Sequence, residues 1–133
     1  MRAFFIPFLF PILNIVTPKE TNLCNQSNTS FNAGEKIRYT IYYNVLGLYV
    51  NAGNADFVTQ STNYNGSEAF TYTATGSSNA RYDWIFKVRD KYESIVDSKS
   101  LLPFQFSRQI NEGRFHQKES ITFNQKNKTA TTS

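Results

Sequence analysis

Hydrophobic and polar residues alternate along much of the chain between residues 35 and 125. The clearest example spans residues 35–43, where every second residue is apolar: Ile37, Tyr39, Ile41 and Tyr43. Residues two positions apart lie on the same side of a strand, so this pattern predicts a strand with one buried face. The pattern continues over residues 46–50 and 55–59, and Gly47 and Gly53 predict bends or bulges there.

Turn-forming residues separate further alternating stretches. Asn65-Gly66 is typical of a tight hairpin turn, because Asn and Gly tolerate a positive φ angle. A second hairpin turn is predicted at residues 111–113, and four further strands are expected over residues 68–75, 90–96, 102–110 and 115–125. Residues 81–88 fit either a strand or one to two helical turns, and the Ser-Ser-Asn sequence before them favours the helix by offering an N-cap.

At least six strands joined by short turns predict an all-β fold. We expect a curved antiparallel sheet, shaped like half a barrel or an incomplete barrel, with at most one short helix near residues 80–88. The expected β domain covers residues 33–125, between a flexible lead-in at 22–32 and a polar tail at 126–133. Because the last predicted strand would leave an uncovered sheet edge, we expect this domain to be the N-terminal part of a longer one.

The first 21 residues predict export. The chain begins with a positive charge and continues with an almost wholly apolar run over residues 3–16. A helix of that length spans only about 21 Å, which is too short for a hydrocarbon core of about 30 Å. We therefore interpret residues 1–21 as a signal peptide or an uncleaved N-terminal anchor.

The processing site of this segment is left open by the sequence. Lipidation of Cys24 is a disfavoured alternative, because Asn22 and Leu23 are not the small residues that such processing needs before the cysteine. We expect an exported protein, periplasmic or associated with the outer membrane, that contacts a membrane only through its N-terminal segment.

Charge and cysteine content exclude several classes of protein. The chain has 14 Lys and Arg against 10 Asp and Glu, but its basic residues are spread among acidic ones and form no stripe of one sign. We therefore expect no nucleic-acid partner. A single Cys and a single His supply neither an intramolecular disulfide nor a structural zinc site, and we expect no metal or cofactor.

Several short stretches, taken together, resemble one known family. They are Phe31-Asn-Ala-Gly-Glu35, Tyr39-Thr-Ile-Tyr-Tyr-Asn44, Asn51-Ala-Gly53, Ala74-Thr-Gly76, the run from Tyr82 to Ser94 with Asp97, Leu101-Leu-Pro-Phe104, Arg108 and Asn111-Glu-Gly113. Their order and spacing resemble the bacterial "domain of unknown function 3108" family of exported envelope proteins. The resemblance implies a Gram-negative envelope location and a curved, mainly antiparallel β architecture, and it implies no activity, cofactor or catalytic residue. Family members are longer, so C-terminal strands are expected to be missing here.

The sequence offers few candidate catalytic groups. His116 is the only histidine, and the alternation around it predicts an exposed strand residue rather than a catalytic base. A hydrolase using Glu93 and Glu112 requires both carboxyl groups to share one cleft, and we treat it as a weaker alternative. We therefore expect no catalytic residue and no enzyme activity.

Charged residues between positions 89 and 112 favour a structural role. Acidic and basic side chains alternate closely enough along this region to pair with one another. We expect an ion-pair network that stabilises the fold, formed by Arg89, Asp90, Glu93, Asp97, Arg108 and Glu112.

Aromatic residues carry the functional hypothesis. The chain has 12 Phe, 8 Tyr and one Trp, and most of them must serve as ordinary core. A curved sheet also has a concave face that can hold an apolar ligand, such as a lipid or an acyl group. The expected ligand-binding residues are Tyr39, Tyr43, Tyr72, Trp84, Phe104 and Phe106. The alternative is a module that binds an envelope protein or a glycan through Tyr42, Tyr64 and the basic residues.

Overall fold

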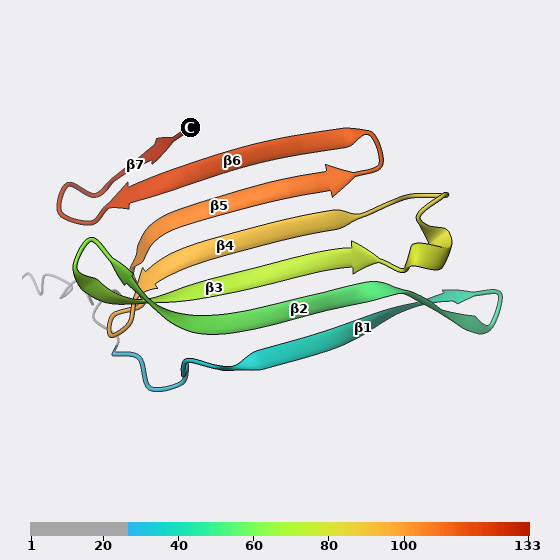
Figure 1. The fold of residues 1–133 in the computed structure, drawn as a ribbon, viewed down its shortest axis with the longest axis horizontal. Coiled ribbons are helices and arrows are strands. Elements are labelled where there is room, and N and C mark those ends of the chain that lie inside the picture. The colour runs from blue at the N-terminus through green and yellow to red at the C-terminus, as the bar shows by residue number, and fades with distance from the viewer. Residues whose placement is uncertain (1–26) are drawn as a thin grey trace, which may run out of the picture.

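The computed structural model describes residues 27–133, which form one antiparallel sheet of seven strands (Figure 1). The strands lie in the sheet in the order of the sequence, from β1 at one edge to β7 at the other. Their bounds are Lys36–Val45 (β1), Leu48–Tyr64 (β2), Ser67–Ser78 (β3), Arg89–Asp97 (β4), Pro103–Glu112 (β5), Phe115–Asn124 (β6) and Thr129–Thr132 (β7). One 3-10 turn, η1, spans Ala80–Tyr82. The predicted all-β antiparallel fold is confirmed, and the sheet is open.

The pairing registers give the sheet two unlike faces. Ile37 lies opposite Phe57, Phe57 opposite Ala74, and Ala74 opposite Tyr92. Because paired residues share a face and alternate residues share a face, these registers define an apolar face. Its apolar members are Ile37, Tyr39, Ile41, Ala55, Phe57, Phe70, Tyr72, Ala74, Tyr92, Val96, Phe106, Ile110, Ile121 and Phe123. The polar face on the other side includes Arg38, Asp56, Thr71, Thr73, Thr75, Lys91, Glu93, Gln109 and Lys118.

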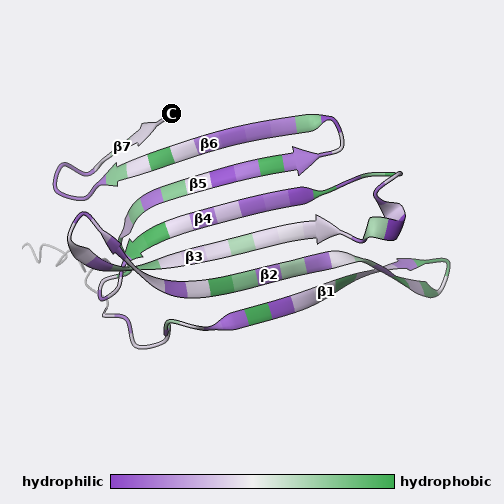
Figure 2. Cartoon of the chain, viewed as in Figure 1, coloured by the Kyte–Doolittle hydropathy of each residue, from purple (hydrophilic) through white to green (hydrophobic). Residues whose placement is uncertain are grey.

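The apolar face has no covering layer within residues 27–133. Every strand there belongs to the one sheet, and the only other element is η1. Hydrophobic and hydrophilic residues alternate visibly along β1 in Figure 2. Among residues 27–133, only Ala69 and Val96 are buried apolar residues, whereas Phe57 keeps 46% of its surface exposed. A sheet normally buries its apolar face against another layer, so this uncovered face is the feature that a function must explain.

Two bulges interrupt the pairing. Ile41 pairs with Gly53 while Tyr42 pairs with Asn51, so Ala52 is an extra residue in β2. A Cβ atom at Gly53 would overlap the Ser77 carbonyl oxygen of β3, and this close backbone approach explains the glycine that the sequence marked as a bend.

The second bulge lies between β4 and β5. Ile95 pairs with Gln105 and Val96 with Pro103, which leaves Phe104 as the extra residue. Phe104 therefore does not keep the alternation with Phe106 that the sequence predicts.

The predicted short helix near residues 80–88 is the 3-10 turn η1. Asn79 caps it, because its side-chain oxygen accepts a hydrogen bond from the backbone N–H of Arg81 at 3.1 Å. Within residues 27–133, no helix is both long enough and apolar enough to cross a bilayer.

Both flanks of the predicted β domain differ from expectation. Asn28 at the predicted flexible lead-in is tied down, since its backbone N–H donates to Lys99 and its amide to Ser98. The predicted polar tail contains β7, which pairs with β6 because β-branched threonines suit a sheet edge even when they are polar. The predicted signal peptide or anchor, residues 1–21, and Cys24 lie outside the described residues.

Candidate functional site

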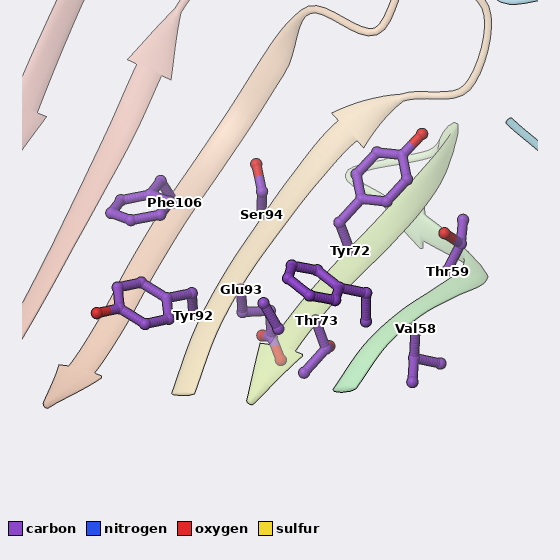
Figure 3. Close-up of a pocket in the computed structure, with 10 residues that line it drawn as sticks. Val58, Thr59, Tyr72, Thr73, Tyr92, Glu93, Ser94 and Phe106 are labelled. Atoms are coloured by element: carbon purple, nitrogen blue, oxygen red, sulfur yellow. The ribbon is translucent and has the colours of Figure 1, made fainter. Parts of the chain in front are cut away.

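A depression lies on the apolar face across β2 to β5 (Figure 3). Its cavity volume is about 190 Å³, and its aromatic lining consists of Phe57, Tyr72, Tyr92 and Phe106. One aromatic residue comes from each of four neighbouring strands. Because the pairing register places all four on the same face, ordinary strand alternation is enough to direct them into one hollow.

A second hollow adjoins the first towards β1. Its cavity volume is about 260 Å³, and Phe57, Thr59 and Tyr72 line both hollows. The second hollow adds residues from β1 and from the segment before it, namely Phe31, Glu35, Ile37 and Tyr39. The two hollows lie side by side across five strands and share the walls formed by Phe57, Thr59 and Tyr72, and together we call them the depression.

Aromatic contacts hold the walls of this depression in place. The ring of Phe31 meets the ring of Tyr72 edge to face, with centroids 5.6 Å apart. Tyr39 meets Phe57 in the same manner at 5.9 Å. Edge-to-face pairs at these distances are favourable beyond their area of contact, so the walls are preformed in the absence of a ligand.

The hydroxyl group of Tyr72 is one of several polar groups in the depression, which also includes Glu35, Thr59 and Ser94. The Tyr72 hydroxyl oxygen is buried and has no hydrogen-bond partner among the described residues. Burial, and then the negative charge of Glu35, raises the pKa of the Tyr72 phenol above its ordinary value. The hydroxyl is therefore protonated at neutral pH and can donate. A buried hydrogen-bond donor without a partner costs about 1–3 kcal/mol of stability. A ligand oxygen that accepts a hydrogen bond from this hydroxyl would remove that cost.

Three of the six predicted ligand-binding residues lie in this depression. Tyr72 lines both hollows, Phe106 lines the first, and Tyr39 lines the second. Their common face follows from the alternation seen in the sequence and from the register, which the sequence does not give.

The other three predicted residues lie elsewhere. Tyr43 pairs with Val50, in the part of the β1–β2 hairpin that extends past the end of β3. Its surface is 66% exposed. Trp84 lies in the connection between η1 and β4 and is 82% exposed. Phe104 sits at the β5 bulge, where its ring stacks on Tyr64 with centroids 5.2 Å apart.

Sequence reasoning missed several residues of the depression. Phe57, Tyr92 and Phe31 were not among the predicted ligand-binding residues, although the structure places all three in its walls. The period-two pattern already placed Phe57 in a strand. What was lacking is the pairing register, which decides that Phe57 faces Tyr39 and Tyr72 rather than the opposite side.

Comparison with family models assigns the fold to a family. The model described as "Protein of unknown function (DUF3108)" matches residues 38–133, from β1 through every later strand. The chain belongs to this family. The resemblance seen in the sequence is thereby confirmed. Comparison with curated proteins and with solved structures found no significant match.

The predicted ion-pair network does not form in the DUF3108 domain. Within residues 27–133, no ion pair joins any two of the six predicted members. Strand alternation separates the members on the polar face, Arg89, Glu93 and Asp97, from Asp90 and Arg108 on the apolar face. In the described sheet, members that share a face form no ion pair with one another, and three of them pair with residues outside the set.

The six residues find other partners instead. Arg108 pairs with Glu119 on β6 at 2.6 Å, and Glu93 pairs with Lys91 at 2.9 Å. The carboxylate of Asp90 is buried and accepts a hydrogen bond from the backbone N–H of Asn111 at 2.9 Å. Glu112 ends β5, where its backbone bridges to Val88.

Arg89 links the η1 connection to the sheet. Its guanidinium donates to both carboxylate oxygens of Asp83, at 3.2 Å and 2.6 Å, and to the Ser78 hydroxyl at 2.9 Å. The Ser78 hydroxyl in turn donates to Asp83 at 2.5 Å. The hydrogen bond from Ser78, followed by the contacts of Arg89, lowers the pKa of Asp83 despite the opposing effect of desolvation.

The catalytic alternatives find little support in the geometry. Glu93 faces the polar side of β4, whereas Glu112 lies at the end of β5, five residues beyond the Ser107 that pairs with Glu93. His116 is exposed, and its Nδ1 lies 3.0 Å from the amide oxygen of Asn111. Among residues 27–133, no group of three or more His, Cys, Asp or Glu side chains is placed to hold a metal ion.

Proposed function

We propose that this protein is an exported, non-enzymatic envelope protein that binds an acyl chain on the apolar face of its sheet. One observation carries the proposal. The depression on that face has aromatic walls, and Tyr72, which lines both of its hollows, carries a buried hydroxyl with no hydrogen-bond partner among residues 27–133. Largely apolar walls with a few polar groups among them are typical of sites that bind an apolar ligand in a fixed orientation.

The electrostatics of the depression select the polar end of the ligand. Tyr72 offers a proton, while Glu35 lines the same hollow and carries a negative charge. A free carboxylate placed there would be repelled by Glu35, whereas a neutral ester or amide carbonyl would accept a hydrogen bond from the Tyr72 hydroxyl without that repulsion. The proposed ligand is therefore an acyl ester or amide, as in a phospholipid, rather than a free fatty acid.

The proposed location rests on the N-terminus. An apolar run of fourteen residues after a positive charge supports export, and a Gram-negative envelope supplies acyl esters in abundance. The alternative role, an envelope-protein or glycan module using Tyr42 and Tyr64, predicts no lipid requirement.

A binding titration tests the proposal. The full chain is titrated with a fluorescent acyl ester and with the matching free fatty acid, and we expect saturable binding with preference for the ester. Tyr72→Phe removes only the hydroxyl and should weaken ester binding about fivefold to tenfold, the value of one buried hydrogen bond. Tyr64→Phe is the matched control, since Tyr64 stacks on Phe104 away from the depression, and it should bind as wild type.

Two results of this titration would overturn the proposal. One is the absence of saturable ester binding together with no co-purifying lipid in mass spectra of native extracts. The other is equal binding by the Tyr72→Phe and Tyr64→Phe variants, because the buried hydroxyl would then have no part in recognition.

A further inference from the structure

The two ends of the sheet differ in the residues that they expose. In a sheet whose strands follow sequence order, successive connections alternate between its ends (Figure 1). The β1–β2 turn, the β3–β4 connection and the β5–β6 turn therefore share one end, which we call the apolar end. The backbone N–H of Gly113 donates to the Lys87 carbonyl at 2.8 Å, so two of these connections are joined directly.

Large apolar side chains crowd the apolar end. Eight of them are exposed there: Val45, Leu46, Leu48, Tyr49, Trp84, Ile85, Phe86 and Phe115. Leu46 at the tip of the β1–β2 turn is fully exposed, at 101%. At the opposite end, the turns at residues 65–66, 98–102 and 125–128 contribute no large apolar side chain to the exposed surface of residues 27–133. Exposed apolar clusters of this kind mark contact surfaces.

Two hairpin turns of the chain have the same geometry, but Leu46 occupies in one of them the position that Asn65 has in the other. In the β1–β2 turn the Asn44 side chain accepts from the Gly47 N–H at 2.9 Å, and in the β2–β3 turn Asn63 accepts from Gly66 at 2.9 Å. The residue before each glycine has a left-handed backbone, with φ of 51° at Leu46 and 50° at Asn65.

This backbone conformation suits Asn and strains Leu. Asn visits the left-handed region readily, whereas a bulky apolar residue pays for it in conformational energy. Leu46 touches little that would compensate this strain, because it is fully exposed. An exposed leucine held at a strained position is the kind of feature that is maintained for contact with another surface.

The β1–β2 hairpin is graded in polarity along its length. No charged residue occurs from Tyr39 to Ala55, and the base of this segment is closed by the ion pair of Arg38 with Asp56 at 2.5 Å. The tip is aliphatic, and Tyr42, Tyr43 and Tyr49 lie behind it, with Tyr43 about 10 Å from Leu46 along the strand. Aliphatic residues followed by tyrosines match the order from acyl chains to headgroups in a bilayer.

Basic residues flank the other two connections at this end. Arg81 and Lys87 stand on either side of the Trp84–Phe86 segment, and Arg114 precedes Phe115. Within residues 27–133 none of these three side chains forms an ion pair, while Asp83 is already paired with Arg89. Basic side chains beside exposed aromatic ones are complementary to a surface with negative headgroups.

We propose that the apolar end docks on the surface of an anionic phospholipid bilayer. The tip around Leu46 enters the region where headgroups meet acyl chains, together with the Trp84–Phe86 segment, and the three basic residues meet the phosphates. The β1–β2 hairpin does not enter more deeply. Beyond the end of β3, both of its edges lack a partner strand among residues 27–133, so their backbone groups need hydrogen bonds from water or headgroups. This contact differs from the N-terminal membrane contact expected from the sequence, and it does not depend on a ligand in the depression.

The single tryptophan of the chain makes the test direct. Trp84 lies at the apolar end, so its emission reports on this surface alone. The full chain is mixed with vesicles of phosphatidylcholine and with vesicles of phosphatidylcholine and phosphatidylglycerol. We expect a blue shift of the Trp84 emission and quenching by brominated acyl chains, both stronger on the anionic vesicles and reduced by salt.

Variants separate docking by this end from binding through the N-terminal segment. Leu46→Asn turns the tip into a copy of the Asn65-Gly66 turn, relieves the backbone strain and should lower vesicle partitioning about tenfold, as expected for withdrawing one leucine from an apolar environment. Leu101→Asn is the matched control: Leu101 also has a positive φ, of 58°, but lies in a turn at the opposite end. It should partition as wild type.

Each alternative outcome overturns the proposal. Unchanged Trp84 emission on vesicles that carry the protein would assign membrane binding to the N-terminal segment. Equal partitioning of Leu46→Asn, Leu101→Asn and wild type would show that the tip does not enter the bilayer, and would favour a protein partner for this end. Equal affinity for both kinds of vesicle would overturn the assignment of an anionic bilayer as the docking surface, and with it the role of Arg81, Lys87 and Arg114.

Discussion

Single residues fix where the strands of this sheet meet. Gly53 is the sharpest case, because β2 and β3 approach so closely at the Ala52 bulge that a side chain at position 53 would overlap the Ser77 carbonyl oxygen. Gly76 lies nearby on β3, yet a Cβ atom there would meet only the Asp90 side chain at 3.9 Å, an ordinary contact. The two glycines therefore play different roles despite their proximity in the sheet.

Gly53→Ala should lower the free energy of unfolding by about 2 kcal/mol or more, because backbone rather than a flexible side chain must move aside. Gly76→Ala should stay within about 0.5 kcal/mol of wild type. Urea denaturation followed by circular dichroism measures both. Equal effects of the two substitutions would contradict the close approach at Gly53.

Arg89 is the second residue with a defined structural task. Its guanidinium joins Asp83 and Ser78, and so fixes the η1 connection to the end of β3. The Arg89–Asp83 ion pair is partly open to solvent, with exposed side-chain fractions of 39% and 24%, so solvent screening limits its strength.

Arg89→Ala should therefore cost about 1 kcal/mol, or about 4–8 °C in Tm for a domain of this size. Lys91→Ala is the control, since the Lys91–Glu93 pair is an exposed contact within one strand and should contribute less. Thermal unfolding of both variants measures the difference. An unchanged Tm for Arg89→Ala would show that the η1 connection is not fastened by this side chain.

At the scale of elements, turns are set by side chains that accept backbone hydrogen bonds. Asp97 ends β4 and accepts from the backbone N–H groups of Ser100 at 2.7 Å and Lys99 at 3.1 Å, and from the Ser100 hydroxyl at 2.8 Å. The backbone hydrogen bond from Ser100 is the largest cause of a pKa of Asp97 below its ordinary value. The negative charge of Asp97 thus stabilises the β4–β5 turn.

This lowered pKa predicts a pH dependence of stability. A carboxyl group whose folded-state pKa is below its unfolded value, about 3.9, contributes stability above that pH and loses it as pH falls through the folded-state pKa. The pKa values of Asp56 and Asp83 are also lowered, so the free energy of unfolding should be constant near neutral pH and fall below about pH 4. Asp97→Asn should be less stable at pH 7 and show a shallower acid decline. An equal decline in both proteins would contradict the role of Asp97.

Most strands were predictable because period-two alternation survives wherever a strand has one apolar side. The pattern placed Ile37, Tyr39 and Ile41 on one face, as the structure does. It failed at Phe104, because a bulge shifts the strand by one residue and no local signal marks the shift. It also missed β7, where Thr129–Thr132 pair as an edge strand without an apolar member to reveal a buried side.

The candidate site was less predictable than the strands that build it. Tyr39, Tyr72 and Phe106 belong to three different strands, and only the register between strands brings them to one depression. The predicted ion-pair network failed in part because alternation places neighbours such as Arg89 and Asp90 on opposite faces. Members that share a face did not pair with one another in the described sheet either, and three of the six pair with residues outside the set. Proximity in sequence is a poor guide to side-chain contacts in a sheet.

At the scale of the whole molecule, the described residues form one layer with an apolar face, a polar face and two unlike ends. A single layer cannot bury its apolar side against itself, so that side is available to a ligand or to another surface. The depression on the apolar face suits an acyl chain, and the apolar end suits a bilayer surface. We propose that the two surfaces act in different steps: the apolar end contacts a membrane, and the depression retains one acyl group.

Nuclear Overhauser contacts between an acyl ester and the protein would locate a bound acyl chain on the sheet. With saturating acyl ester, we expect contacts from acyl-chain protons to the rings of Phe57 and Phe106 on the apolar face, and none to the Ile95 methyl groups on the polar face. Contacts confined to Trp84 and its neighbours, or no contacts with either ring, would contradict the proposed acyl-chain site.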